Sequence, residues 1–169
     1  MKIKSISIKN FRSYMNETTI SFDNLTAFIG KNDVGKSTIL EALDVFFHDG
    51  KGSIKLDKED INKNAIDSGD TDIVITASFK ELPTSVILDE TNSTTLQDEY
   101  LLNSDGCLQV KKTFTRGSTT SSNIKVSLLA NHPTNSECDK LLQKKQADLL
   151  KIIEKLGIEC EDKRKNAFS

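Results

Sequence analysis

The stretch Gly30-Lys31-Asn32-Asp33-Val34-Gly35-Lys36-Ser37 has the spacing G-x-x-x-x-G-K-[ST], which is typical of a phosphate-binding loop. Gly30 and Gly35 allow backbone angles and a close approach that a side chain would prevent. The backbone amides from Val34 to Thr38 are expected to point at phosphate oxygens, at the positive end of the helix that follows. The loop therefore predicts nucleotide binding.

Two side chains of this loop have predicted chemical roles. Lys36 reaches the terminal phosphates and is the predicted catalytic residue. Ser37 supplies the hydroxyl ligand of Mg²⁺, a cation that binds few protein oxygens and keeps several waters and phosphate oxygens. No other residue of the chain is assigned as specifically from its position alone.

The sequence on either side of the loop supplies the strand and the helix that such a loop needs. Leu25-Thr26-Ala27-Phe28-Ile29 has the length and composition of a buried strand that ends at Gly30. From Lys36 to about Phe47 apolar residues recur at helical spacing, and His48-Asp49-Gly50 ends the pattern. With both flanks present, a glycine turn that spells the motif by chance is the weaker interpretation.

Composition describes one modest soluble domain. The chain has 169 residues, of which 36% are hydrophobic and 28% are charged, and its formal net charge is -2. No stretch approaches the roughly 18 apolar residues of a membrane span, and no apolar signal segment follows Met1, so we expect a cytoplasmic protein with no membrane partner. Cys107, Cys138 and Cys160 form no C-x-x-C pair, which argues against disulfides and a zinc site.

Further strands are predicted from alternating or β-branched runs. They cover residues 2–9, 18–22, 72–80, 107–115 and 123–129, and the last three form an antiparallel meander. Ile3 falls out of phase with Ile6 and Ile8, which indicates a bulge or the start of the first strand. Residues 50–70 are predicted to be a solvated connection with a short helix near 58–64, and residues 90–105 are ambiguous.

A second helix is predicted from about residue 136 to residue 156. Leu142, Leu149, Ile153 and Leu156 are close to heptad spacing, and Gly157 is a plausible C-terminal stop. Two interpretations stay open. The helix packs on the domain, or it begins a coiled coil or dimerisation arm.

Two motifs together carry a family resemblance. The strand end Ile8-Lys9-Asn10-Phe11-Arg12 reads I-x-N-F-R, and Gly30 to Ser37, about twenty residues further on, reads G-x-N-x-x-G-K-S. This pair, which is more specific than the loop alone, resembles the N-terminus of the SMC, RecF and OLD group of ABC-type ATPases. The resemblance covers roughly residues 1–130, with the strongest motifs in 1–47.

The resemblance implies an α/β P-loop NTPase head of ABC-ATPase type. In it, a mixed sheet carries the phosphate loop and its helix, an antiparallel β meander packs beside that sheet, and a C-terminal helix follows. The implied cofactors are ATP and Mg²⁺. The implied nucleotide-binding residues are Arg12, Gly30, Asn32, Asp33, Val34, Gly35, Lys36, Ser37 and Thr38.

Three of these residues are compared with the family directly. Arg12 corresponds to an arginine near the phosphates and Asn32 to the asparagine of the loop, although a surface arginine that closes a strand is the alternative for Arg12. SMC and RecF proteins usually have Gly where this chain has Asp33. OLD-type nucleases and related phage-defence ATPases often tolerate Asp there, so Asp33 favours the OLD-like branch.

The motifs that complete such a head are not found downstream of Ser37. There is no apolar strand ending in Asp-Glu, no serine-glycine signature and no switch histidine. We therefore expect nucleotide binding with little hydrolysis from this chain alone, because hydrolysis also needs an orienting base and further charge stabilisation. The family's metal-sensing glutamine has four candidates that stay open: Gln97, Gln109, Gln143 and Gln146.

The expected organisation is an N-terminal lobe at 1–130 and, at 131–169, a helix with a charged tail. The resemblance implies a homodimer or larger assembly of heads, coupled to DNA handling in repair or anti-phage defence, or to a partner nuclease or effector. The net charge of -2 offers no global attraction to DNA. Two lysine-rich sets, more simply read as solvated faces, are Lys111, Lys112, Arg116 and Lys125, and Lys140, Lys144, Lys145 and Lys151.

Two other classes remain as alternatives. A P-loop kinase or GTPase uses the same loop but usually begins with the loop strand and continues with alternating helices and parallel strands. A non-catalytic interaction module would bind nucleotide only to regulate assembly with a partner.

Overall fold

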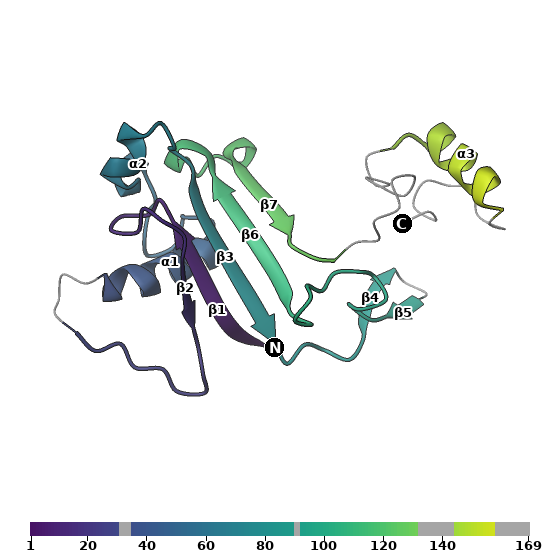
Figure 1. The fold of residues 1–169 in the computed structure, drawn as a ribbon, viewed down its shortest axis with the longest axis horizontal. Coiled ribbons are helices and arrows are strands. Elements are labelled where there is room, and N and C mark those ends of the chain that lie inside the picture. Colours follow the sequence, from purple (N-terminus) through teal and green to yellow (C-terminus); the bar gives the residue numbers. More distant parts are fainter. Residues whose placement is uncertain (31–34, 90–91, 132–143, 158–169) are drawn as a thin grey trace. The chain divides into compact units, whose positions relative to one another are not determined.

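A computed structural model describes residues 1–30, 35–89, 92–131 and 144–157 (Figure 1). The chain divides into two compact units, residues 1–131 and residues 132–169. Among the described residues, the first unit contains all the strands, the helix that follows the predicted phosphate loop and a shorter helix, and the second unit contains one further helix. None of the helices in the described ranges is long and apolar enough to cross a membrane.

A five-stranded sheet forms the framework of the first unit (Figure 1). Its strands are β1 (Lys2–Lys9), β2 (Thr18–Ser21), β3 (Ile73–Lys80), β6 (Leu108–Phe114) and β7 (Ile124–Leu128), in the order β2-β1-β3-β6-β7. Every neighbouring pair in it is antiparallel. The prediction of a mixed sheet was therefore wrong for the described residues. The predicted meander is confirmed, but β3, β6 and β7 continue the same sheet as β1 instead of packing beside another one.

Residues 25–29 do not form the predicted strand. The side chains of Leu25 and Ile29 are 90% and 94% exposed, and no described strand pairs with this segment. Phe28 is half-buried and stacks edge-on against Phe22, with 6.3 Å between the ring centroids. An extended segment becomes a strand only when a neighbour accepts and donates its backbone hydrogen bonds, and none of the five strands is placed to do so.

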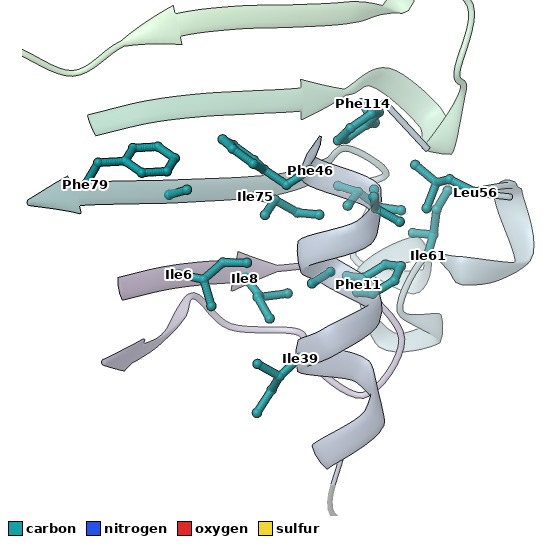
Figure 2. Close-up of a cluster of buried hydrophobic side chains, with 14 residues drawn as sticks. Ile6, Ile8, Phe11, Ile39, Phe46, Leu56, Ile61, Ile75, Phe79 and Phe114 are labelled. Carbon is teal, nitrogen blue, oxygen red and sulfur yellow. The ribbon is translucent and has the colours of Figure 1, made fainter. Parts of the chain in front are cut away.

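The core lies between one face of the sheet and helix α1 (Lys36–His48), as Figure 2 shows. Antiparallel register puts Ile6 opposite Ala77 and Ile8 opposite Ile75, so the alternate residues of β1 and β3 share this face. The helix contributes four buried apolar side chains: Ile39, Ala42, Val45 and Phe46. Full burial of one large aliphatic or aromatic side chain stabilises the fold by about 1.5–3 kcal/mol. The predicted helix and the bulge between Ile3 and Ser5 are both confirmed.

The connection from α1 to β3 is more ordered than predicted. It contains a 3-10 turn, η1 (Lys58–Asp60), and a short helix, α2 (Lys63–Asp67), which together replace the single helix predicted near 58–64. Leu56 and Ile61 anchor this connection because both side chains are buried in the core. The segment is therefore fixed against the end of β1, not simply solvated.

The remaining elements are short. An unpredicted hairpin pairs β4 (Val86–Asp89), which precedes the ambiguous region, with β5 (Asn92–Thr94), which lies inside it. Two 3-10 turns, η2 (Thr115–Gly117) and η3 (Ser121–Asn123), connect β6 to β7. In the second unit, α3 (Gln146–Leu156) ends at Gly157, which has the left-handed φ of 65° expected of a C-cap. Leu142 lies outside the described residues, so the heptad interpretation stays a prediction.

Candidate functional site

Gly35 fixes the start of α1 in a conformation that suits only glycine. Its φ is 76°, in the left-handed region. A Cβ atom there would lie 2.8 Å from the Ser13 hydroxyl oxygen and 3.3 Å from the ring of Tyr14. The Tyr14 hydroxyl also donates to the Gly35 carbonyl over 3.4 Å. The turn after β1 therefore lies directly against the first residues of α1.

The first turn of α1 offers backbone amides to an anion. No side-chain hydrogen bond caps the helix at Gly35, its N-cap residue, and no acidic side chain lies in the first turn. Lys36 donates from Nζ to the Gly30 carbonyl over 2.6 Å, which links the two ends of the predicted loop. Ser37 is exposed and Thr38 is buried in the same turn. Asn32, Asp33 and Val34 lie outside the described residues, so their predicted contacts stay predictions.

Arg12 lies in the turn after β1 and makes two ion pairs. Its Nε donates to Asp60 Oδ1 over 2.8 Å, and its Nη1 pairs with the carboxylate of Glu41 in α1. Burial alone lowers the pKa of Arg12, but the hydrogen bonds to Asp60 and Glu41 outweigh it, so the pKa lies above the ordinary value. The guanidinium also lies 5.3 Å from the ring centroid of Phe11. Arg12 is therefore a partly buried cation held by two carboxylates, and its predicted place near the phosphates stays a prediction.

Backbone hydrogen bonds hold this turn against η1. Arg12 adopts a left-handed φ of 49°, which is uncommon for a residue with a side chain. Its amide donates to the Asp60 carbonyl over 2.7 Å, and Asn62 donates from its side chain to the Arg12 carbonyl. The Asn62 amide also donates to the Asn10 carbonyl over 3.0 Å. Since these contacts define the turn, the position of Arg12 depends on residues almost fifty positions away.

Glu41 connects this turn to the predicted phosphate loop. Ser37 and Glu41 are four residues apart in α1, so they share one helix face, with about 5–6 Å expected between their Cβ atoms. An open depression of about 500 Å³, lined in part by Arg12, Asp60 and Asn62, lies beside the guanidinium. The structure thus brings Arg12 to the N-terminal part of α1, where the phosphates are predicted to bind.

Sequence reasoning missed Glu41, Asp60, Asn62 and Tyr14. The spacing of Glu41 from Ser37 is a usable signal, because it places a carboxylate one helical turn from the predicted metal ligand. For Asp60 and Asn62 the local sequence holds no such signal, since their contacts with Arg12 depend on how the connection folds back.

The structure does not select one of the four candidates for the metal-sensing glutamine. Gln109 lies in β6, where its side chain accepts from Asn103, and Gln97 lies in the turn after β5. Gln146 begins α3 in the second unit, and Gln143 lies outside the described residues. The choice among them stays open.

The lysines predicted to gather on the meander are divided between its two faces. Lys111 and Lys125 lie on one face, because Lys111 is opposite Ser127 and Lys125 is opposite Thr113. Lys112 lies on the other face, where its Nζ binds Asp49 over 2.6 Å and the Phe46 carbonyl over 2.8 Å. Arg116 lies in η2. Lys144, Lys145 and Lys151 belong to the second unit, and Lys140 lies outside the described residues.

The cysteine pattern gives no site in the described residues. Cys107 is a buried free thiol, and Cys138 and Cys160 lie outside those residues. No group of three or more metal-ligating side chains occurs in the part of the chain that the structure describes.

A glycine-started helix with a lysine and a serine in its first turn, on an α/β framework, defines a nucleotide-binding class of protein. The chain belongs to the AAA ATPase domain family, whose match covers residues 1–168. This membership confirms nucleotide binding as the general function of the domain.

Individual relatives match over shorter segments. The chain is 46% identical over 50 residues to the structural maintenance of chromosomes protein 3 homolog of Plasmodium falciparum, and 46% identical over 44 residues to the chromosome partition protein Smc of Halobacteriovorax marinus. These segments cover 29% and 25% of the chain and 4% of each relative. The chain therefore matches only a small part of the length of these proteins.

One solved structure with a similar arrangement is described as "Structural biochemistry of ATP-driven dimerization and DNA stimulated activation of SMC ATPases". It is 18% identical to this chain, with a TM-score of 0.47, over 81% of this chain and 75% of that one.

Proposed function

We propose that this chain is the ATP-binding part of a DNA-associated ATPase head of the SMC, RecF and OLD kind. The supporting observation is that Lys36, Ser37 and the turn that holds Arg12 meet at the N-terminal part of α1. Helix amides and two cations at one place suit a triphosphate, which carries several negative charges. Lys36 and Arg12 bind the phosphates, Ser37 holds the metal, and Asn32, Asp33, Val34 and Thr38 complete the loop.

Mg²⁺, when bound with the nucleotide, neutralises part of the charge that develops on the phosphates during transfer. Ser37 fits this role because it lies in the first turn of α1 and is exposed, so its hydroxyl is accessible to a metal ion bound with the nucleotide. A single protein oxygen is sufficient, since Mg²⁺ keeps waters and phosphate oxygens as its other ligands. The described residues thus bind and orient a nucleotide but do not supply a base for attacking water.

The head is proposed to be incomplete without further motifs and a second head. The exposed segment 25–29 supports this, because its apolar side chains are of the kind that neighbouring strands cover. Hydrolysis then requires the missing C-terminal motifs and a homodimer or larger assembly, with 131–169 as the start of a dimerisation or coiled-coil arm. Asp33 supports an OLD-like endonuclease or phage-defence ATPase over a repair protein. DNA and a partner nuclease or effector enter through the family resemblance.

The direct test is equilibrium binding of ATP, ADP and GTP with Mg²⁺, with phosphate release followed in the same samples. Lys36→Ala is expected to weaken ATP binding by about 10- to 100-fold, because it removes a charge-assisted hydrogen bond. Lys51→Ala is the matched control, since Lys51 is an exposed lysine beyond the other end of α1. Unchanged binding by Lys36→Ala would refute the assignment.

Turnover separates the proposed head from its alternatives. Almost no phosphate release by the chain, with release restored by a partner or by the C-terminal motifs, supports an incomplete ATPase head. Retained ATP affinity that no partner converts to hydrolysis supports a non-catalytic interaction module. A strong preference for GTP supports the GTPase alternative.

A further inference from the structure

Arg12 has two anionic partners although it carries one charge. Asp60 and Glu41 contact different nitrogens of the guanidinium, Nε and Nη1. The Nη2 group has no partner among the described residues. The side chains of Arg12, Asp60 and Glu41 are 33%, 14% and 24% exposed, so water screens these charges only in part. The cluster is therefore negative overall, because it contains two carboxylates and one guanidinium.

Asp60 holds Arg12 in place without help from Glu41. One Asp60 oxygen accepts from Arg12 Nε over 2.8 Å, and the other accepts from the Asp57 amide over 3.1 Å. The Asp60 carbonyl also accepts from the Arg12 amide. Asp60 is thus fixed by both its side chain and its backbone, and it fixes the base of the Arg12 side chain. The carboxylate of Glu41 has no second partner in the described part of the chain.

The two cations proposed to bind phosphate both contact protein acceptors in the nucleotide-free chain. Lys36 donates to the Gly30 carbonyl and Arg12 pairs with Glu41. The acceptors differ in charge, because a carbonyl is neutral and a carboxylate is an anion. Two opposite charges attract each other more strongly than a charge attracts a neutral carbonyl, so of these two contacts the one between Arg12 and Glu41 costs more to separate.

We propose that Glu41 is a placeholder anion, which occupies Arg12 in the nucleotide-free protein and is exchanged for a terminal phosphate oxygen when nucleotide binds. This inference rests on the proposed function of Arg12 as a phosphate ligand. Asp60 stays paired with Nε and acts as the pivot, while Nη1 and Nη2 become the end that faces the phosphate. Glu41 suits the exchange because it lies on α1, the helix that begins with Lys36 and Ser37. Glu41 therefore limits the affinity for nucleotide.

The test is a double-mutant cycle on equilibrium ATP binding with Mg²⁺, using the whole chain. Glu41→Gln keeps the size of the side chain and removes its charge, so it is expected to tighten ATP binding by about two- to fivefold, the range of a partly exposed ion pair. In the Arg12→Ala background the same substitution is expected to change affinity little. Glu59→Gln is the matched control, because Glu59 lies next to Asp60 and lines the same depression but has no described contact with Arg12.

Four outcomes overturn the proposal. Weaker binding by Glu41→Gln means that Glu41 positions Arg12 for the nucleotide. Equal tightening with and without Arg12, or by Glu59→Gln as well, means that only the general charge of the region matters. Glu41→Ala must also tighten binding, and thermal unfolding of each variant shows whether the fold is retained. Lys36→Ala keeps the two proposals apart, since a failure of nucleotide binding itself appears there and not in the Glu41 cycle.

Discussion

The first strand and the segment before the phosphate loop are both predicted as strands but have opposite environments. β1 pairs with β2 on one side and with β3 on the other, and its Ile6 and Ile8 are completely buried. Residues 25–29 pair with no described strand, and Leu25 and Ile29 are almost completely exposed. The comparison shows that an apolar run becomes a strand only where the topology provides neighbours, whatever its own composition.

The difference also changes how the predicted phosphate loop is supported. On its C-terminal side the loop continues into α1, whose Ile39, Ala42 and Val45 are packed in the core. On its N-terminal side it follows an extended segment without sheet hydrogen bonds. The described contacts that fix the loop therefore come from α1, from the bond between Lys36 and Gly30, and from the turn at Tyr14.

The largest expected effect is the difference in stability between truncating a side chain in the core of the sheet and truncating one in the exposed segment 25–29. Phe114→Ala removes a completely buried ring at the end of β6 and is expected to lower the free energy of unfolding by about 3–5 kcal/mol. Leu25→Ala removes an exposed side chain and is expected to change it by less than about 0.5 kcal/mol. Urea denaturation of both variants gives the two values. A cost above about 1 kcal/mol for Leu25→Ala would show that the segment packs against the fold, which would break the comparison.

A second prediction compares two glycines in turns, and it separates the cost of a strained backbone from the cost of a steric clash. Gly117 and Gly106 have nearly equal φ values of 63° and 67°, but a Cβ at Gly117 would lie 2.8 Å from the Asp57 carbonyl oxygen, whereas Gly106 has nothing within 4 Å. Gly106→Ala is expected to cost about 1 kcal/mol for the left-handed backbone alone. Gly117→Ala is expected to cost about 1–3 kcal/mol more, because a backbone atom must shift. Equal losses of stability for the two variants, in thermal or urea unfolding, would mean that η2 can shift to make room at no measurable cost.

The sequence predicts those parts of the fold whose signals are local. Alternation identified β1 and β2, and β-branched composition identified β3, β6 and β7. Helical spacing identified α1, and the phase of Ile3 indicated a bulge or a strand start, of which the structure contains the bulge. The short apolar run at residues 25–29 was misleading, because composition cannot say whether a neighbouring strand exists. The β4–β5 hairpin was missed because its apolar run is too short to give a period.

The candidate site was predictable to the same extent. The spacing of the loop motif identified Gly35, Lys36 and Ser37 directly, since their roles depend on neighbours in the sequence. The partners of Arg12 depend on contacts across 29 and 48 positions, to Glu41 and Asp60. No periodicity connects residues so far apart, and only the folded connection brings them together.

The smallest expected effect concerns how the end of β1 is held. Lys9 Nζ lies 2.8 Å from Asp70 Oδ2, and the hydrogen bond from Lys9 is the main reason that the pKa of Asp70 lies below its ordinary value. A carboxyl whose pKa is lowered by folding stabilises the protein above its unfolded pKa of about 4, and this contribution is lost as the pH falls through the folded value. Because both side chains are about 40% exposed, Asp70→Asn is expected to cost well below 1 kcal/mol at pH 7.

The pH dependence tests whether this small effect belongs to the ion pair. The difference in unfolding free energy between wild type and Asp70→Asn is expected to be larger at pH 7 than at a pH below the lowered pKa of Asp70, where the carboxyl is protonated. Asp23→Asn is the matched control in the exposed region, because Asp23 precedes residues 25–29 and has no described ion pair. It is expected to change stability little at either pH. A loss at Asp70 that is equal at both pH values would assign the effect to side-chain packing, and β1 would then be held by its sheet neighbours alone.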